Sequence, residues 1–393
     1  MKRQFFTSLI FLTSFSVFSQ VLDPLLKISE LQVKSDSFYN AGLFKSQIVL
    51  KNERKVVEDN NIFFTALTLY TLQSIADSLD ESQQIIIDTI YNRAKNNFNL
   101  YKNRNGGITY NFYQVRPIDR PFPNLKRFSK KEAARLPDDL DDTSILYLIQ
   151  ETEDSLVVEL KKQMENEVFK APAVKSSLKR YRDFNAYRTW FVDKMSQDMD
   201  ICVNTNVLLL MFNKEVEFNT VDFASMGFIM QVIIDDAHKD NEEIISPHYS
   251  NTAIILYHVS RLVSILNHKA LNEIRPKLLK DIAEELDEVE NEFERLILLT
   301  SLYRLGSEVE YSIELEKLEH DMNSFYWFQA NLISVRDVLI KKIFGGNKHL
   351  YFRYKSEAFY WSLVLELQTL SKGKIVKDLD SGMDILIKDT ILE

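Results

Sequence analysis

Four aspartates lie within five residues in the first half of the chain. They are Asp138, Asp139, Asp141 and Asp142, and the apolar stretch 145–148 follows them. An aspartate at a helix start can cap free backbone N–H groups and face the positive end of the helix dipole, which explains one or two of the four. Carboxylates this close also repel one another and raise each other's pKa. Since a carboxylic acid that stays protonated near neutral pH can act as a general acid, the cluster predicts either acid catalysis or a helix cap.

Residues 139–143 read Asp-Leu-Asp-Asp-Thr, which resembles the DxDDT motif of class II terpenoid cyclases, the group of squalene–hopene and diterpene cyclases. The resemblance implies a fold of α/α barrels and a reaction in which Asp141 protonates an isoprenoid alkene or epoxide. It implies that Asp139 and Asp142 polarise and orient this acid, and that Thr143 supports it. The 26 phenylalanines, 17 tyrosines and three tryptophans would supply cavity walls that stabilise carbocations through their π faces. No cofactor is expected.

Residues 138–142 also satisfy DDxxD, the magnesium–diphosphate motif of class I prenyl-transferring enzymes. Those enzymes need a second metal motif of the NDxxSxxxE kind, which the sequence lacks. It also lacks HExxH and any cysteine cluster, because Cys202 is the single cysteine. We therefore predict no metal centre.

A second polar set interrupts the apolar stretch 201–212. Asp200 and Asn204 are four residues apart and share one side of a helix, and Asn206 lies less well on that side. We expect them to support the acidic cluster or a substrate; the alternative is a helix cap and polar surface.

Irregular backbone is concentrated just before the aspartates. Four of the eight prolines and the adjacent pair Gly106 and Gly107 fall in 103–141. Long ordered loops in compact helical domains tend to be functional. We expect this loop to present the aspartates. The expected pocket walls, each with ordinary core packing as the alternative, are Tyr110, Phe112, Tyr113 and Trp190.

Glycine is scarce, with nine in 393 residues. Proteins built from sheets and barrels use glycine at many of their turns, so this scarcity disfavours them. Apolar residues recur at helical spacing over most of the chain. These features predict an all-α fold, a single α/α toroid of about twelve helices in which inner and outer helices alternate around a central cavity. An α-solenoid is the alternative, although no repeat of fixed period is present. The predicted helices span 61–79, 83–100, 142–166, 186–198, 201–213, 221–237, 250–267, 273–286, 289–305, 325–344, 355–371 and 375–390.

Charge and motifs exclude several classes of protein. The net charge is −9 and no long basic run occurs, which argues against nucleic acid as a partner. The glycines form neither GxGxxG nor GxxxxGK[ST], so Rossmann and P-loop nucleotide binding are not expected. GxSxG is also absent, which leaves a serine triad without support.

The N-terminus has the layout of a secretory signal peptide. Lys2 and Arg3 precede an apolar stretch, 5–18, that is shorter than a bilayer crossing needs, and small residues stand before Gln20. We predict a signal peptide over 1–19, a single domain over 20–393, and a periplasmic or secreted protein. An uncleaved anchor is the alternative.

Three functions follow from these features. The first is an exported cyclase-like enzyme that protonates an isoprenoid in an aromatic cavity, with a hydrophobic small molecule as its partner and room for peripheral contact with a membrane. The second is a periplasmic (α/α)6 glycan-active enzyme with two carboxylates across a groove. The third is a non-catalytic toroid that serves as a scaffold or binding protein.

Overall fold

The computed structural model describes residues 23–50, 55–123, 135–170, 173–192, 196–307, 309, 311, 313–345 and 347–372. The predicted signal peptide over 1–19 and the predicted helix over 375–390 lie outside these residues. The helices are α1 (Pro24–Leu31), α2 (Phe63–Ile75), α3 (Glu81–Ala94), α4 (Leu140–Leu148), α5 (Asp154–Lys170), α6 (Ile201–Asn213), α7 (Thr220–Ile234), α8 (Ala237–Asp240), α9 (Glu242–Ile245), α10 (Thr252–Leu266), α11 (Lys269–Asn272), α12 (Arg275–Glu288), α13 (Glu292–Arg304), α14 (Leu315–Ser324), α15 (Val338–Phe344) and α16 (Glu357–Leu370). The strands are β1 (Ser46–Leu50), β2 (Lys55–Asp59), β3 (Phe328–Asn331) and β4 (Tyr351–Lys355).

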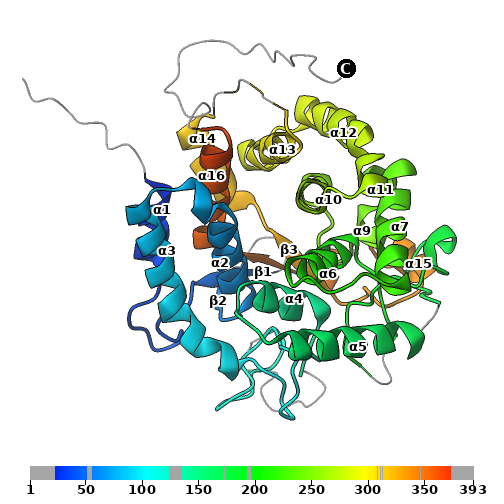
Figure 1. Ribbon diagram of the computed structural model, residues 1–393, viewed down its shortest axis with the longest axis horizontal. Helices are drawn as coiled ribbons and strands as arrows, with labels where there is room; N and C mark the ends of the chain where they lie inside the picture. Colours follow the sequence, from blue (N-terminus) through cyan, green and yellow to red (C-terminus); the bar gives the residue numbers. More distant parts are fainter. Residues whose placement is uncertain are drawn as a thin grey trace, which may run out of the picture.

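Six helices form a closed ring at the centre of the molecule. In chain order they are α2, α4, α6, α10, α13 and α16; each packs against the next, and α16 returns to α2. The helices between them in the chain, such as α3, α5, α7 and α12, lie outside the ring (Figure 1). Among the described residues, no helix is both long and apolar enough to cross a bilayer.

The sequence explains which helices are inner and which are outer. In α6 the apolar residues occur on every side, and each residue over 201–211 is buried. A helix that is apolar all round must be surrounded by other elements. In contrast, α12 has charged residues on most of its circumference and buries one stripe that includes Leu278, Ile282 and Leu286. A helix with one apolar stripe can cover the ring and face solvent.

The ring helices begin at the same end of the ring. Five of the six helices each have a residue at or just before their start that lines one and the same cavity. These residues are Phe63 of α2, Asp141 of α4, Val203 of α6, Tyr249 before α10 and Tyr354 before α16. The start of α13 joins them, because Asn251 Nδ2 donates to Glu294 Oε1 at 2.9 Å. The positive ends of the six helix dipoles therefore converge on this end.

The prediction of an all-α fold is wrong, because a four-stranded antiparallel sheet covers this end of the ring. The strand order is β2-β1-β4-β3, with Ile48 opposite both Val57 and Tyr354, and Phe328 opposite Tyr354. The protein is thus mostly helical but mixed α/β. Glycine scarcity could not reveal this sheet, since its strands have only four or five residues and neither they nor residues 51–54, which link β1 to β2, contain glycine.

Three predicted helices are also wrong. The helix predicted over 142–166 is two helices, because α4 ends at Leu148 and Lys214 Nζ donates to the carbonyl of Gln150 just beyond it, at 2.7 Å. Residues 186–192 and 196–198 are irregular instead of helical, and Trp190 pairs with Asp139 in an isolated β-bridge. The stretch 325–344 contains strand β3 before α15. In each case a contact with a distant segment outweighs local helical spacing.

A buried ion pair inside the ring gives a test of its packing. Arg304 Nε of α13 donates to Glu366 Oε1 of α16 at 2.6 Å, and Tyr257 Oη of α10 donates to Glu366 Oε2 at 2.7 Å. We expect Arg304→Met to lower the free energy of unfolding by about 3–5 kcal/mol, because it leaves a buried carboxylate without its cation. Urea denaturation measures this loss. The control is Lys280→Met, which removes the exposed pair between Lys280 and Glu284 and should leave stability close to wild type. Equal losses of stability in both variants would contradict the special importance of the buried pair between Arg304 and Glu366.

Candidate functional site

A cavity of about 390 Å³ lies between the ring and the sheet. Aromatic and aliphatic side chains form most of its lining, and the polar part of the lining includes three of the clustered aspartates, Asp139, Asp141 and Asp142, together with His248. All three aspartates are buried, with exposed fractions of 7%, 8% and 2%. The aromatic side chains of the lining are Phe63, Phe112, Phe122, Trp190, Tyr249, Phe328 and Tyr354.

Asp139 and Asp142 form a carboxyl pair at the start of α4. Asp139 caps the helix, and its Oδ1 accepts a hydrogen bond of 2.8 Å from the backbone N–H of Asp142. Burial raises the pKa of Asp139 to about 7; the charge of Asp141 adds to this rise, and a side-chain hydrogen bond with Asp142 opposes it. Burial and the neighbouring charge of Asp139 raise the pKa of Asp142 well above its ordinary value. The two carboxyl groups therefore share a proton that they keep to higher pH than exposed aspartates would.

Asp141 has a different environment from its neighbours. Its Oδ1 accepts a hydrogen bond of 2.6 Å from Asn206 Nδ2, and its Oδ2 accepts one from the hydroxyl of Tyr249. The buried guanidinium of Arg261 donates to Asn206 Oδ1 at 2.5 Å and so fixes the orientation of this amide. Burial raises the pKa of Asp141, while the hydrogen bonds from Tyr249 and Asn206 lower it. Both carboxyl oxygens thus accept a hydrogen bond that stabilises the carboxylate form.

His248 supplies a positive charge on the cavity wall. Its Nε2 lies 3.2 Å from Asp198 Oδ2, its backbone N–H donates to Asp200 Oδ2 at 2.9 Å, and its ring lies edge-on to Trp190. Burial disfavours the imidazolium, but the charge and hydrogen bond of Asp198 and the charge of Asp200 raise the pKa of His248 to about 9. The imidazolium in turn lowers the pKa of Asp139. Acid and imidazolium therefore line the same cavity.

Two members of the predicted cluster hold the loop instead of lining the cavity. Asp138 accepts hydrogen bonds from Asn103, Thr109 and Asn111 at 2.5–3.1 Å, and so ties the irregular segment to the start of α4. Thr143 Oγ1 accepts a hydrogen bond of 3.0 Å from the backbone N–H of Tyr110. Both residues position the segment that presents the other aspartates.

The remaining predicted residues divide between the site and its support. Phe112 and Trp190 line the cavity, whereas Tyr110 and Tyr113 lie outside its lining. The hydroxyl of Tyr113 donates to Asp59 Oδ1 at 2.9 Å, and the ring of Tyr110 packs edge-on against Tyr147.

The second polar set on α6 divides in the same way. Asn206 contacts Asp141 directly, and Asp200 caps α6 and orients His248. Asn204 bonds the backbone of Tyr187 with both its amide oxygen and its nitrogen, and so fixes the neighbouring segment.

His248, Tyr249, Asp198 and Arg261 were not predicted as site residues. The turn Ser-Pro-His-Tyr directly before α10 contained the signal, because residues that precede an inner helix reach the end where the aspartates lie. Recognising that signal requires knowing that α4 and α10 start at the same end of the ring. Asp198 and Arg261 gave no local signal.

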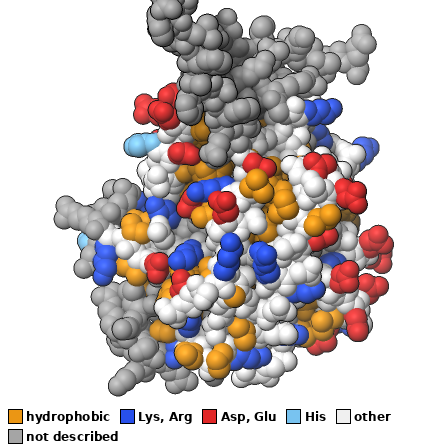
Figure 2. Space-filling view, turned by 90° about the vertical axis from the view of Figure 1, so that its left-hand side faces the viewer, with side chains coloured by type: hydrophobic (Ala, Val, Ile, Leu, Met, Phe, Trp, Pro, Cys, Tyr) orange, Lys and Arg blue, Asp and Glu red, His pale blue; other side chains and the backbone are white. Residues whose placement is uncertain are grey.

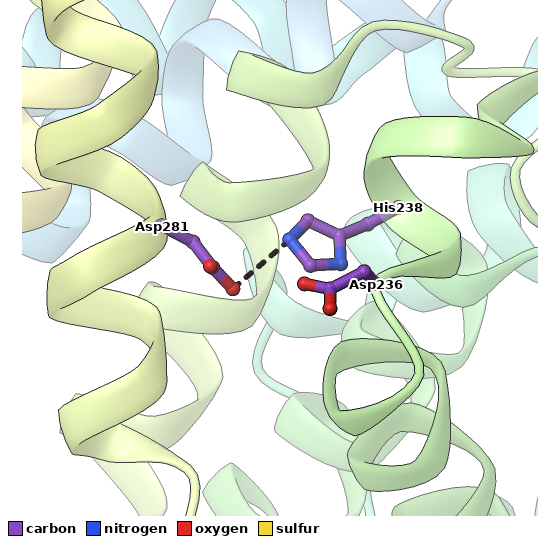
Figure 3. A group of neighbouring side chains, drawn as sticks. All are labelled: Asp236, His238 and Asp281. Carbon is purple, nitrogen blue, oxygen red and sulfur yellow. Dashed lines mark ion pairs between the residues drawn. The ribbon is translucent and has the colours of Figure 1, made fainter.

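A separate group, away from the cavity lining, has metal-ligand atoms in reach of one another. Ligand atoms of Asp236, His238 and Asp281 lie within 4.8 Å of each other, with His238 directed toward Asp281 (Figure 3). Two ammonium groups already neutralise these carboxylates, since Lys277 contacts Asp236 and Asp281 at 2.5 and 3.0 Å and Lys239 contacts Asp281 at 2.8 Å. A divalent cation would have to displace them, so the group fits a charge cluster between α8 and α12 better than a metal centre.

The shared proton of the carboxyl pair predicts a pH-dependent stability. Because the pKa of Asp139 is raised to about 7, the folded state keeps a proton that the unfolded chain loses above about pH 4. The free energy of unfolding of wild type should therefore fall, relative to Asp139→Asn, as pH rises from 4 to 7, and the difference should level off above 7. Asparagine keeps the helix cap. Urea unfolding of both proteins across pH 4–8 measures the difference; a difference that is constant or grows with pH would contradict the shared proton.

No family model, no curated protein and no solved structure matches the chain. The resemblance to class II terpenoid cyclases therefore stays a prediction from the five residues 139–143.

Proposed function

We propose that the protein is an acid–base enzyme that protonates an alkene or epoxide of an isoprenoid-like small molecule in its aromatic cavity. The observation that carries the proposal is the location of Asp139, Asp141 and Asp142, buried together in the wall of a cavity that is otherwise mostly apolar. A protonated carboxyl group away from bulk water can transfer its proton to a weak base such as an alkene. The exported location predicted from the N-terminus remains part of this proposal.

Asp141 delivers the proton in this proposal. Burial keeps it protonated to higher pH than an exposed aspartate, and the donors Tyr249 and Asn206 stabilise its carboxylate once the proton has moved. The O–H bond of Asp141 breaks, and either a C–H bond forms as the alkene π bond breaks, or an O–H bond forms as a ring C–O bond of the epoxide breaks. A carbon next to the resulting cation then gives a proton back to a carboxylate of the cluster. The acid is thereby regenerated, so the net reaction is an isomerisation that needs no redox partner.

The cavity walls favour a carbocation intermediate. Phe112, Phe328 and Tyr354 are buried and pack edge-on or stacked around one another, with Phe328 and Tyr354 centroids 4.5 Å apart. Aromatic faces attract a positive charge without offering a nucleophile that would capture it. The carboxyl groups and the polar lining residues Gln329, Asn331 and Ser334 are the observation that favours the glycan-active alternative.

Substitution of the aspartates tests the proposed acid. We expect Asp141→Asn to lower turnover of an acyclic isoprenoid alkene or epoxide at least about a thousandfold, because the amide has no proton of suitable acidity to give. Product formation followed by gas chromatography measures the loss. The control is Asp154→Asn, in the first turn of outer helix α5, which should keep wild-type turnover. Turnover that persists undiminished in Asp141→Asn would rule out this role.

A cationic analogue tests the cavity walls independently of turnover. An isoprenoid amine, charged at the position of the carbocation, should bind more tightly than its neutral hydrocarbon counterpart. Phe112→Leu should weaken the amine about three- to tenfold and change the affinity of the hydrocarbon by less than about twofold. Calorimetric titration of both ligands gives the comparison. Equal effects on the two ligands would show that the wall acts only through its shape.

A further inference from the structure

Helix α15 turns its apolar side outward. Leu339, Ile343 and Phe344 have exposed fractions of 66%, 63% and 51%, and Ile340 is also exposed. The one buried residue of this helix is Lys341, at 4%. This is the reverse of an ordinary surface helix, which buries its apolar residues and exposes its lysines.

The inward lysine explains the orientation. Lys341 Nζ donates to the carbonyl of Ser176 at 2.9 Å, and its ammonium interacts with the charges of Asp198 and Asp200 behind the cavity wall. A buried cation that faces buried carboxylates is costly to turn out. The helix is therefore held with its apolar side toward the surroundings.

Basic residues occur on α15 and close to it. Arg336, just before α15, and Lys342, on α15, are exposed. Lys175 and Lys179 are exposed on the segment that Lys341 contacts from the buried side of α15. Two acids lie nearby. The charge of Asp337 is balanced by Arg182, at 3.7 Å, and Glu243 lies beside Gly345 at the end of the helix. This concentration of cations stands out in a chain of net charge −9.

The segment that leads into α15 reaches the cavity. Leu332, Ser334 and Val335, which link β3 to α15, line the cavity, and Leu332 is also 48% exposed. The chain thus passes from the cavity wall to the exposed apolar residues of α15 within a few residues.

We propose that α15 docks on an anionic lipid surface, with Leu339, Ile340, Ile343 and Phe344 entering the headgroup region and the nearby lysines and arginine contacting lipid phosphates. Apolar side chains with cations close by are the chemistry that such a surface recognises. The proposal rests on the proposed function only in taking the substrate to be apolar.

Vesicle binding tests the docking. The full chain is mixed with vesicles of phosphatidylcholine alone or of equal parts phosphatidylcholine and phosphatidylglycerol, and the bound fraction is measured by flotation. We expect Leu339→Ser combined with Ile343→Ser to weaken binding to the anionic vesicles at least about tenfold. Lys342→Glu combined with Lys175→Glu should weaken it several-fold and remove most of its dependence on salt.

The matched control is Leu26→Ser combined with Ile85→Ser. These residues are also more than half or about half exposed, at 59% for Ile85 and 50% for Leu26, but lie on α3 and α1, on a side where acidic, basic and apolar side chains are intermixed (Figure 2). The control should bind vesicles like wild type, and any contribution of residues 1–19 is common to all variants. Equal binding by the α15 variant and the control would overturn the proposal. So would a wild-type dimer, seen by light scattering, that the α15 variant abolishes.

Turnover of a detergent-dispersed substrate separates this proposal from the proposed function. If α15 only docks the protein, its double variant keeps that turnover, whereas Asp141→Asn binds vesicles normally and loses it. A chain that binds vesicles through α15 but never turns over an isoprenoid would contradict the function and leave the docking intact.

Discussion

The convergence of six helix starts on one end of the ring is the constraint on which the rest of the structure depends. Each start presents backbone N–H groups without partners inside the helix, and a positive dipole end. Asp139 and Asp200 satisfy these groups on α4 and α6, and Asn251 and Asn291 do so on α10 and α13. The same geometry that calls for acidic and amide caps gathers those caps at one end of the ring, where Asp139 lines the cavity.

The start of α4 has more aspartates than capping of the helix requires. Asp141 and Asp142 lie in the first turn of α4 beside a cap that already serves the helix, and their burial favours the neutral acid over the carboxylate. The positive helix ends and His248 oppose this tendency without cancelling it. The site therefore combines buried carboxyl groups of raised pKa with groups that stabilise their anions, an arrangement that costs folding energy.

The sequence contained the parts of the fold that depend on local pattern. The bounds predicted for α6 agree with the structure, and those for α7, α10, α13 and α16 differ by only a few residues, since each has a long apolar stretch with clear ends. The sheet was missed because β1 and β4 pair across some 300 residues and neither has a turn signal of its own. The aspartates were found from their spacing alone. His248 and Arg261 were not, because their roles depend on which helix ends meet, and no local pattern records that.

The sheet also has a consequence for how the chain folds. Strand β1, near the start of the described chain, pairs with β4, near its end, and α16 closes the ring against α2 directly afterwards. During synthesis the first strand and helix must wait for almost the whole chain before they gain these partners. The cavity wall formed by β3 and Tyr354 is thus among the last parts to be completed, and a chain ending before β4 would expose the aspartates and aromatic residues of an open ring to water.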